Sequence, residues 1–124
     1  MYSTIKKFLE RLLMSNFFDS EIIQNELEEI NELQKTLYRD VMEFSTMERD
    51  EQVEHIDLLT ELLDRQKIMY ARLSLSDDPE AINMKNHLQK SIPLMGFPTG
   101  TDMNLLFDGM KKTISQLKEN IDKP

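Results

Sequence analysis

Glu51 and His55 are the residues whose types and spacing come closest to metal chemistry. They stand four positions apart, so a helix would place a carboxylate and an imidazole on one face. Di-metal carboxylate bundles use Glu-x-x-His on two helices and a glutamate on each of two others, and this sequence holds no Glu-x-x-His. We therefore expect His55 to be structural or solvated, and we expect no metal and no cofactor. A carboxylate and histidine metal-binding bundle is the alternative hypothesis.

The motifs of common enzyme classes do not occur in the chain. There is no Gly-x-Ser-x-Gly elbow for a serine nucleophile, and there is no cysteine. The stretch GFPTGTD at residues 96–102 lacks the Gly-Lys-Ser/Thr ending with which a phosphate loop holds a nucleotide. We therefore expect a protein that is not an enzyme.

Negative charge is concentrated in the first half of the chain. Residues 14–64 hold fifteen acidic and three basic side chains, a balance of −12 in a chain whose net charge is −8. A protein that tracks phosphates needs a basic stripe, so direct binding of nucleic acid is not expected. The acidic residues are either the solvated outside of the fold or a surface for a basic protein partner. The candidate contact residues of such a surface are Glu28, Glu29, Glu32, Glu51, Glu54 and Asp57.

The spacing of apolar residues predicts an all-α fold. Two long helices, at about residues 19–44 and 46–74, are expected to form an antiparallel hairpin. Two shorter helices, at about residues 79–91 and 102–121, are expected to pack on this hairpin. A single helical domain over residues 14–124 follows from this pattern.

Capping residues mark where the predicted helices begin. Asp19 is expected to cap the first long helix. Ser45 with Glu48 three positions later has the pattern of a capping box for the second. Asp78 is expected to cap the third helix, with Pro79 at its first position, where a missing amide hydrogen costs nothing.

The two long helices carry wide apolar rows. Those of the first are Ile23, Leu27, Ile30, Leu37, Val41 and Phe44, and those of the second are Ile56, Leu59, Leu63, Tyr70 and Leu73. Gln34 and Gln66 each interrupt one row. A polar residue in such a row can fix register or oligomeric state by demanding a partner, although a glutamine can also simply reach water. Two helices cannot cover rows this wide, so either the later helices or a second copy of the chain must pack across them; the length of the two helices favours a homodimer.

Residues 1–13 are interpreted as a separate N-terminal amphipathic helix. Its apolar residues are Ile5, Phe8, Leu9, Leu12 and Leu13, and its basic residues are Lys6, Lys7 and Arg11. The apolar stripe suits a core, a dimer contact or a membrane surface, but a helix this short binds membranes weakly, so we do not expect membrane binding. The segment is also a poor secretory signal. Without cysteines or a signal, a cytoplasmic location is expected.

Three segments resemble a known family. They are FFDSEIIQNE at residues 17–26, LLDRQKIMYARLSLSDD at residues 62–78 and LLFDGM at residues 105–110. Together they resemble a small all-helical family of unknown function found in cyanobacteria and their phages, over roughly residues 14–121. The resemblance implies a source and a helical fold, but no activity. We therefore expect a protein-interaction or regulatory module in a bacterial or phage-infected cell.

Overall fold

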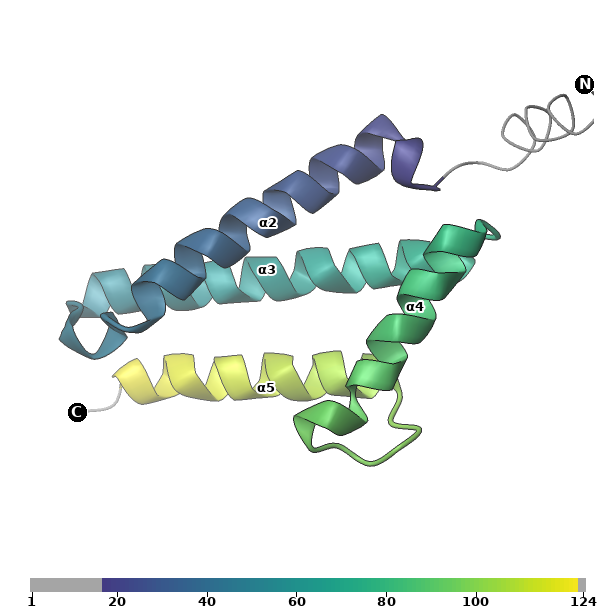
Figure 1. Cartoon of the computed structure of the whole chain (residues 1–124). Coiled ribbons are helices and arrows are strands. Elements are labelled where there is room, and N and C mark those ends of the chain that lie inside the picture. The colour runs from purple at the N-terminus through teal and green to yellow at the C-terminus, as the bar shows by residue number, and fades with distance from the viewer. Residues whose placement is uncertain (1–16, 123–124) are drawn as a thin grey trace, which may run out of the picture.

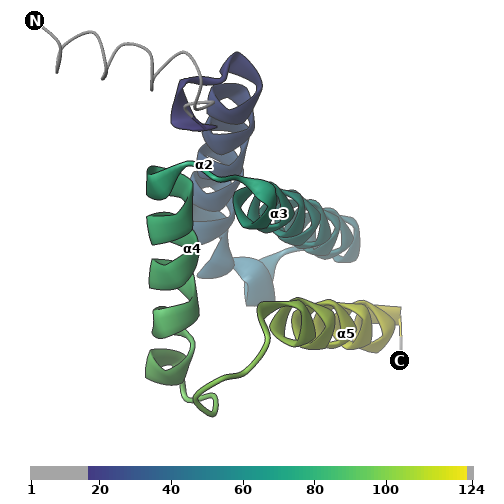
Figure 2. The same cartoon turned by 90° about the vertical axis from the view of Figure 1, so that its right-hand side faces the viewer.

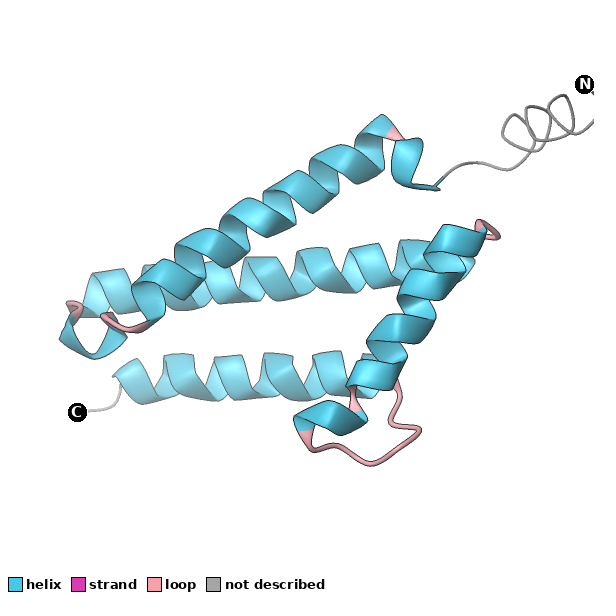
Figure 3. Ribbon diagram, in the orientation of Figure 1, coloured by secondary structure: helices cyan, strands magenta, loops and turns pink. Residues whose placement is uncertain are grey.

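The computed structural model describes residues 17–122, and this part of the chain is all-helical (Figures 1 and 3). Its α-helices are α2 (Glu21–Val41), α3 (Arg49–Leu75), α4 (Pro79–Ser91) and α5 (Met103–Asp122). Three short 3₁₀ turns, η1 (Phe17–Asp19), η2 (Phe44–Thr46) and η3 (Pro93–Met95), precede α2, α3 and the loop to α5. The predicted all-α fold with two long and two shorter helices is confirmed. The oligomeric state and residues 1–13 lie outside what is described.

Helix α3 lies at the centre of the arrangement. Both α2 and α5 run antiparallel to it, and α4 crosses one end of the assembly (Figures 1 and 2). The main helix contacts are those of α3 with α5, α2 and α4, whereas α2 and α5 make no extensive contact with each other. The predicted hairpin of α2 and α3 is therefore present, and α5 forms a second antiparallel pair with the same central helix.

The core consists of two apolar clusters, both of which use α3. The first joins the start of α2 to α3 and α4 through Phe17, Ile23, Ile30, Met69, Leu73 and Ala81. The second joins α3 to the C-terminal end of α4 and to α5 through Leu63, Tyr70, Ile92, Met103, Leu106 and Phe107. Leu88 of α4 packs against both clusters. One helix therefore holds the described elements together.

The predicted cap at Asp78 is confirmed. One oxygen of its carboxylate accepts a hydrogen bond from the amide of Glu80 at 3.0 Å, and Pro79 occupies the first turn of α4. The other oxygen accepts a hydrogen bond from the amide of Phe17 at 2.5 Å. Asp78 is itself buried. Its carboxylate therefore links the beginning of the described chain to the start of α4.

The other two predicted helix starts are wrong. The η1 turn extends through Asp19, so Ser20 is the N-cap residue of α2, and it makes no side-chain capping bond. The η2 turn takes up Ser45, and α3 begins after Glu48, again without a side-chain cap. Each predicted cap fails because a short 3₁₀ turn, which the apolar spacing does not reveal, delays the helix.

Alternate members of the α2 apolar row have different environments. Ile23, Ile30 and Leu37, which are seven residues apart, are buried. Leu27 and Val41 are 38% and 50% exposed. Only half of the row is therefore buried, whereas Leu27 and Val41 remain exposed and Phe44, in η2, is half-buried near His55 of α3.

Three ion pairs join α3 and α5 in a single antiparallel register. They are Asp57 with Lys118 at 2.8 Å, Asp64 with Lys111 at 3.9 Å and Lys67 with Asp108 at 3.7 Å. A step of seven residues along α3, from Asp57 to Asp64, matches a step of seven backwards along α5. This row of pairs, the α3–α5 ladder, lies along the edge of the helix contact and marks its register.

Candidate helix-binding groove

The six predicted acidic contact residues do not form one unpaired surface. The carboxylate of Glu29 accepts a hydrogen bond from Arg65, and Asp57 belongs to the α3–α5 ladder. A carboxylate oxygen of Glu32 lies 3.9 Å from Nζ of Lys35. The other three, Glu28, Glu51 and Glu54, are exposed on two different helices. Part of the predicted acidic surface is therefore neutralised within the fold.

Arg65 pairs with two of the acidic residues. Its guanidinium donates hydrogen bonds to Glu61 on its own helix and to Glu29 on α2. The pKa of Arg65 is raised, chiefly by the hydrogen bond with Glu61; desolvation opposes this rise, and the charge of Glu29 adds to it. Arg72 on α3 pairs with Glu26 of α2 at 3.1 Å. Arg65 and Arg72 of α3 thus fasten the α2–α3 hairpin.

The two candidate metal ligands are not assembled into a site. His55 is buried, and its ring lies 5.4 Å from that of Phe44. Glu51 is exposed. Within residues 17–122 there is no group of three or more carboxylate, imidazole or thiol side chains that could hold a metal ion. The structure gives the alternative metal hypothesis no support in this region.

The most distinct surface feature is an elongated apolar groove between α2 and α5, with α3 as its floor. It consists of three adjoining hollows of about 600, 550 and 430 Å³. Leu59 and Leu62 of α3 line both the α2-side and the α5-side hollow. Gln66, Leu106 and Met110 line both the α5-side hollow and the one next to α4. These shared residues make the hollows one continuous groove.

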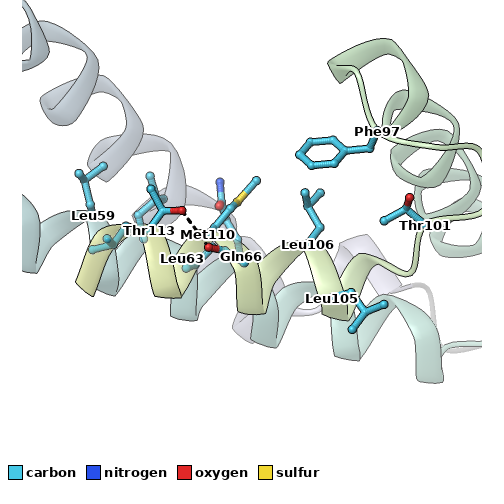
Figure 4. Close-up of a pocket in the computed structure, with 12 residues that line it drawn as sticks. Leu59, Leu63, Gln66, Phe97, Thr101, Leu105, Leu106, Met110 and Thr113 are labelled. Carbon is cyan, nitrogen blue, oxygen red and sulfur yellow. Dashed lines mark hydrogen bonds between the residues drawn. The ribbon is translucent and has the colours of Figure 1, made fainter. Parts of the chain in front are cut away.

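The α5 side of the groove is seen in Figure 4. Leu59, Leu63 and Gln66 of α3 lie along the floor, and Leu106 and Met110 project from α5. Phe97, from the loop before α5, stands across from Leu106 at one end. Gly109 also lines this wall, and a methyl group added there would meet no described atom within 4 Å. The wall of α5 is therefore open to a packed neighbour.

The groove is poor in charge, although the chain as a whole is acidic. Among the described residues that line its three hollows, Lys35 is the only lysine, and no arginine, aspartate or glutamate contributes. His55 lies at the α2-side hollow. Because convergent polar groups are few and the groove is long, it suits an apolar helix face better than a small polar ligand.

The two glutamines of the apolar rows both face this groove. Gln34 of α2 is exposed and lines the α2-side hollow, and Gln66 of α3 is half-buried and lines the other two. The structure thus brings the predicted register residues to one surface, with Gln34 on the α2 wall and Gln66 on the floor. Whether they fix a register with a partner stays a prediction.

The comparison with known proteins agrees with the resemblance seen in the three motifs. A family model described as "Domain of unknown function (DUF1825)" matches residues 15–121. The chain belongs to this family. No curated protein and no solved structure matches it significantly. The DUF1825 match includes every residue that lines the groove and begins after residue 14.

All three motifs of the DUF1825 resemblance contribute residues to the framework of the fold. FFDSEI contains Phe17 and LSDD contains Asp78, and the two are hydrogen-bonded to each other. Phe107 of the third motif is buried against Tyr70, with ring centroids 6.0 Å apart. These motif residues therefore build the framework, and Phe18 and Phe107 of the motifs also line the groove at its α4 end.

Sequence inspection missed the groove and the α3–α5 ladder. The ladder has a visible signal, since Asp57 and Asp64 are seven apart and so are Lys111 and Lys118. The groove has a weaker one, the excess of apolar residues over what two helices can cover. The packing of α5 decides which apolar residues of α2 and α3 remain uncovered, and local sequence patterns do not predict this packing.

Proposed function

We propose that this protein is a non-enzymatic interaction module that binds one amphipathic helix of a partner protein in the groove. The observation that carries the proposal is that α2, α3 and α5 supply three of the four sides of a helical bundle, while their described residues leave the fourth side apolar and open. Helix-in-groove recognition uses this geometry, with anchors at every third or fourth residue of the guest helix.

The charge distribution indicates the chemistry of the guest helix. Its inner face should be apolar, because the groove is lined mainly by leucine, methionine and phenylalanine. Its outer face should carry lysine or arginine, because a chain of net charge −8 attracts a positive partner. Exposed acids such as Glu28 and Glu32 then act by long-range attraction rather than as the contact surface itself.

Gln34 and Gln66 have a place in this proposal. A buried polar group without a partner costs free energy, so a guest helix with a polar residue opposite each glutamine binds in one register rather than several. An affinity on the order of micromolar is expected for a single helix docked in this way. We infer that the partner is a cytoplasmic protein of a bacterial or phage-infected cell and that the module regulates it.

Site-specific photo-crosslinking in the native cell tests the proposal. A photoreactive amino acid at position 66, on the groove floor, should crosslink to a segment with apolar residues at helical spacing. The matched control position is Ile68, which is 51% exposed and lies outside the groove, near Glu26 and Arg65. Crosslinks that were equal at both positions, or that mapped to segments without an apolar stripe, would reject the proposed function.

A groove variant adds a second requirement. Leu27→Glu, at an exposed groove position of α2, should abolish the crosslink from position 66 because it places a charge against the apolar face of the guest. Tyr38 is 83% exposed at the outer lip. Tyr38→Glu should weaken the crosslink much less. Persistence of the crosslink in Leu27→Glu would show that the captured segment binds elsewhere.

A further inference from the structure

We propose that residues 1–13 of this same chain dock in the groove and compete there with the partner helix. This inference rests on the proposed function, because it assigns a regulator to the same surface. It starts from two apolar sets. The groove exposes one set of apolar side chains on α2, α3 and α5, and the sequence of residues 1–13 contains another at helical spacing.

The point of attachment favours docking within one chain. Phe17, the first described residue, is buried and held by Asp78, and Phe18 lines the groove at the α4 end. Residues 14–16 connect this point to residue 13, and three residues span at most about 10 Å. The C-terminal end of a helix at residues 1–13 is therefore restricted to the neighbourhood of the groove.

The chemistry of residues 1–13 matches that inferred for the guest helix. Ile5, Phe8, Leu9 and Leu12 follow helical spacing and form an apolar stripe. A helix of 13 residues is about 20 Å long, and α2, which forms one wall, is about 31 Å long at the same rise per residue. Lys6, Lys7 and Arg11 are then directed toward the acidic surroundings. Length, apolarity and charge therefore agree with the groove.

The topology is the common one for a four-helix bundle. A helix that leads through a short connection into α2 runs antiparallel to it. Since α5 runs in the same direction as α2, and α3 runs opposite to both (Figure 1), the docked helix would be antiparallel to both walls and parallel to the floor. Each adjacent pair in the bundle α2, α3, α5 and residues 1–13 is then antiparallel, as in up-down-up-down bundles.

Docking in this way would control access to the groove. A short connection gives the tethered segment an effective concentration on the order of millimolar. If the segment occupies the groove nine-tenths of the time, the apparent dissociation constant of any partner rises about tenfold, because only the free fraction binds. A partner would then bind strongly only by displacing the segment.

The test uses the full chain and a fluorescein-labelled peptide of residues 1–16 as probe. Leu9→Glu/Leu12→Glu, the stripe variant, places two charges in the proposed docking face and should release the groove. We expect the stripe variant to bind the probe at least tenfold more tightly than the unaltered chain in fluorescence anisotropy. Circular dichroism of both proteins checks that the described helices remain folded.

Two further variants in the stripe background locate the probe. Met110→Glu changes a groove residue that is 37% exposed and should remove binding. Ile68→Glu introduces the same charge at an apolar residue outside the groove and should leave the affinity within about twofold. Loss of binding in Ile68→Glu alone would contradict the assignment of the probe to the groove.

The outcomes separate this inference from the proposed function. Equal probe affinity in the unaltered chain and the stripe variant would overturn docking of residues 1–13 and leave the groove free for a partner. No binding to either protein would overturn docking, whereas crosslinking of a partner at position 66 would still uphold the proposed function. A dimer of the unaltered chain that dissociates in the stripe variant would overturn docking within one chain, because the segment would then bind a second copy.

Discussion

The carboxylate of Asp78 accepts hydrogen bonds from two backbone amides, those of Glu80 and Phe17, which would otherwise lack this acceptor. Its carboxylate caps α4 and binds the amide of Phe17, which lies 61 residues away in sequence. The first task could be predicted from the Asp-Pro pattern alone because it is local. The second could not, because it depends on the path of the chain from η1 to the far end of α3. The same limit explains the incorrect assignment of Asp19, since η1 is held in place by this distant carboxylate.

Removal of the Asp78 carboxylate should destabilise the protein measurably. Asp78→Ala removes a helix cap and leaves a buried amide without an acceptor, so we expect the free energy of unfolding to fall by about 2 to 3 kcal/mol. Urea denaturation followed by circular dichroism measures the change. Asp77→Ala, at the exposed neighbouring acid, should stay within about 0.5 kcal/mol of the unaltered protein. Equal effects of the two substitutions would contradict the role assigned to Asp78.

At the scale of the elements, the heptad rows specify the α2–α3 hairpin but not its surroundings. The rows of both helices contain the residues that become buried, such as Ile30 and Leu63, and so the hairpin was predictable. They also contain Leu27 and Val41, which are exposed in the described fold. Periodicity identifies apolar faces, whereas the fraction of a face that is covered depends on the position of α5. That position is selected by packing over the whole assembly.

The α3–α5 ladder can be tested by reversing its charges. Asp57→Lys/Asp64→Lys places lysines opposite Lys118 and Lys111, so the free energy of unfolding should fall by roughly 1 kcal/mol, the upper range for exposed pairs. Adding Lys111→Asp/Lys118→Asp should restore it, because the same register then pairs opposite charges again. Urea denaturation at low salt is the measurement, since high salt screens such pairs.

A control separates the ladder from net charge. Glu28→Lys/Glu54→Lys alters net charge by the same amount at exposed acids outside the ladder, and it should not lower stability. If the four-residue swap failed to recover the stability lost in the double variant, the pairs would not share one register in solution.

At the scale of the whole molecule, the described residues build a framework that leaves one side apolar. None of the helices in the described part combines the length and the hydropathy that a membrane span requires. The acidic residues, for which the sequence left open a solvated exterior or a surface for a basic partner, are partly used to fasten α2 and α5 to α3. The run of acidic residues can be recognised in the sequence, whereas the groove can be recognised only once the packing of α2, α3 and α5 is known. The candidate interaction surface therefore differs most between sequence and structure at this scale.

Exposure of the groove can be followed with a hydrophobic dye. The stripe variant should increase fluorescence of anilinonaphthalene sulfonate severalfold over the unaltered chain, because that dye binds exposed apolar surface. Adding Met110→Glu should reduce the signal again, since it polarises the groove wall. The comparison is made well below the unfolding temperature of each variant. An unchanged signal in the stripe variant would mean that residues 1–13 do not cover apolar surface.

Methionine is prominent in the hollow of the groove next to α4. Five of the nine methionines in the chain line it: Met69, Met84, Met95, Met103 and Met110. Thioether side chains are unbranched and polarisable, so such a lining can adjust its shape to guests with different side chains. The same atoms are sensitive to peroxide, and conversion to the polar sulfoxide weakens apolar surfaces. Reversible oxidation of these methionines would thus lower the affinity of the groove for a docked helix, and this affinity would depend on the oxidative state of the cell.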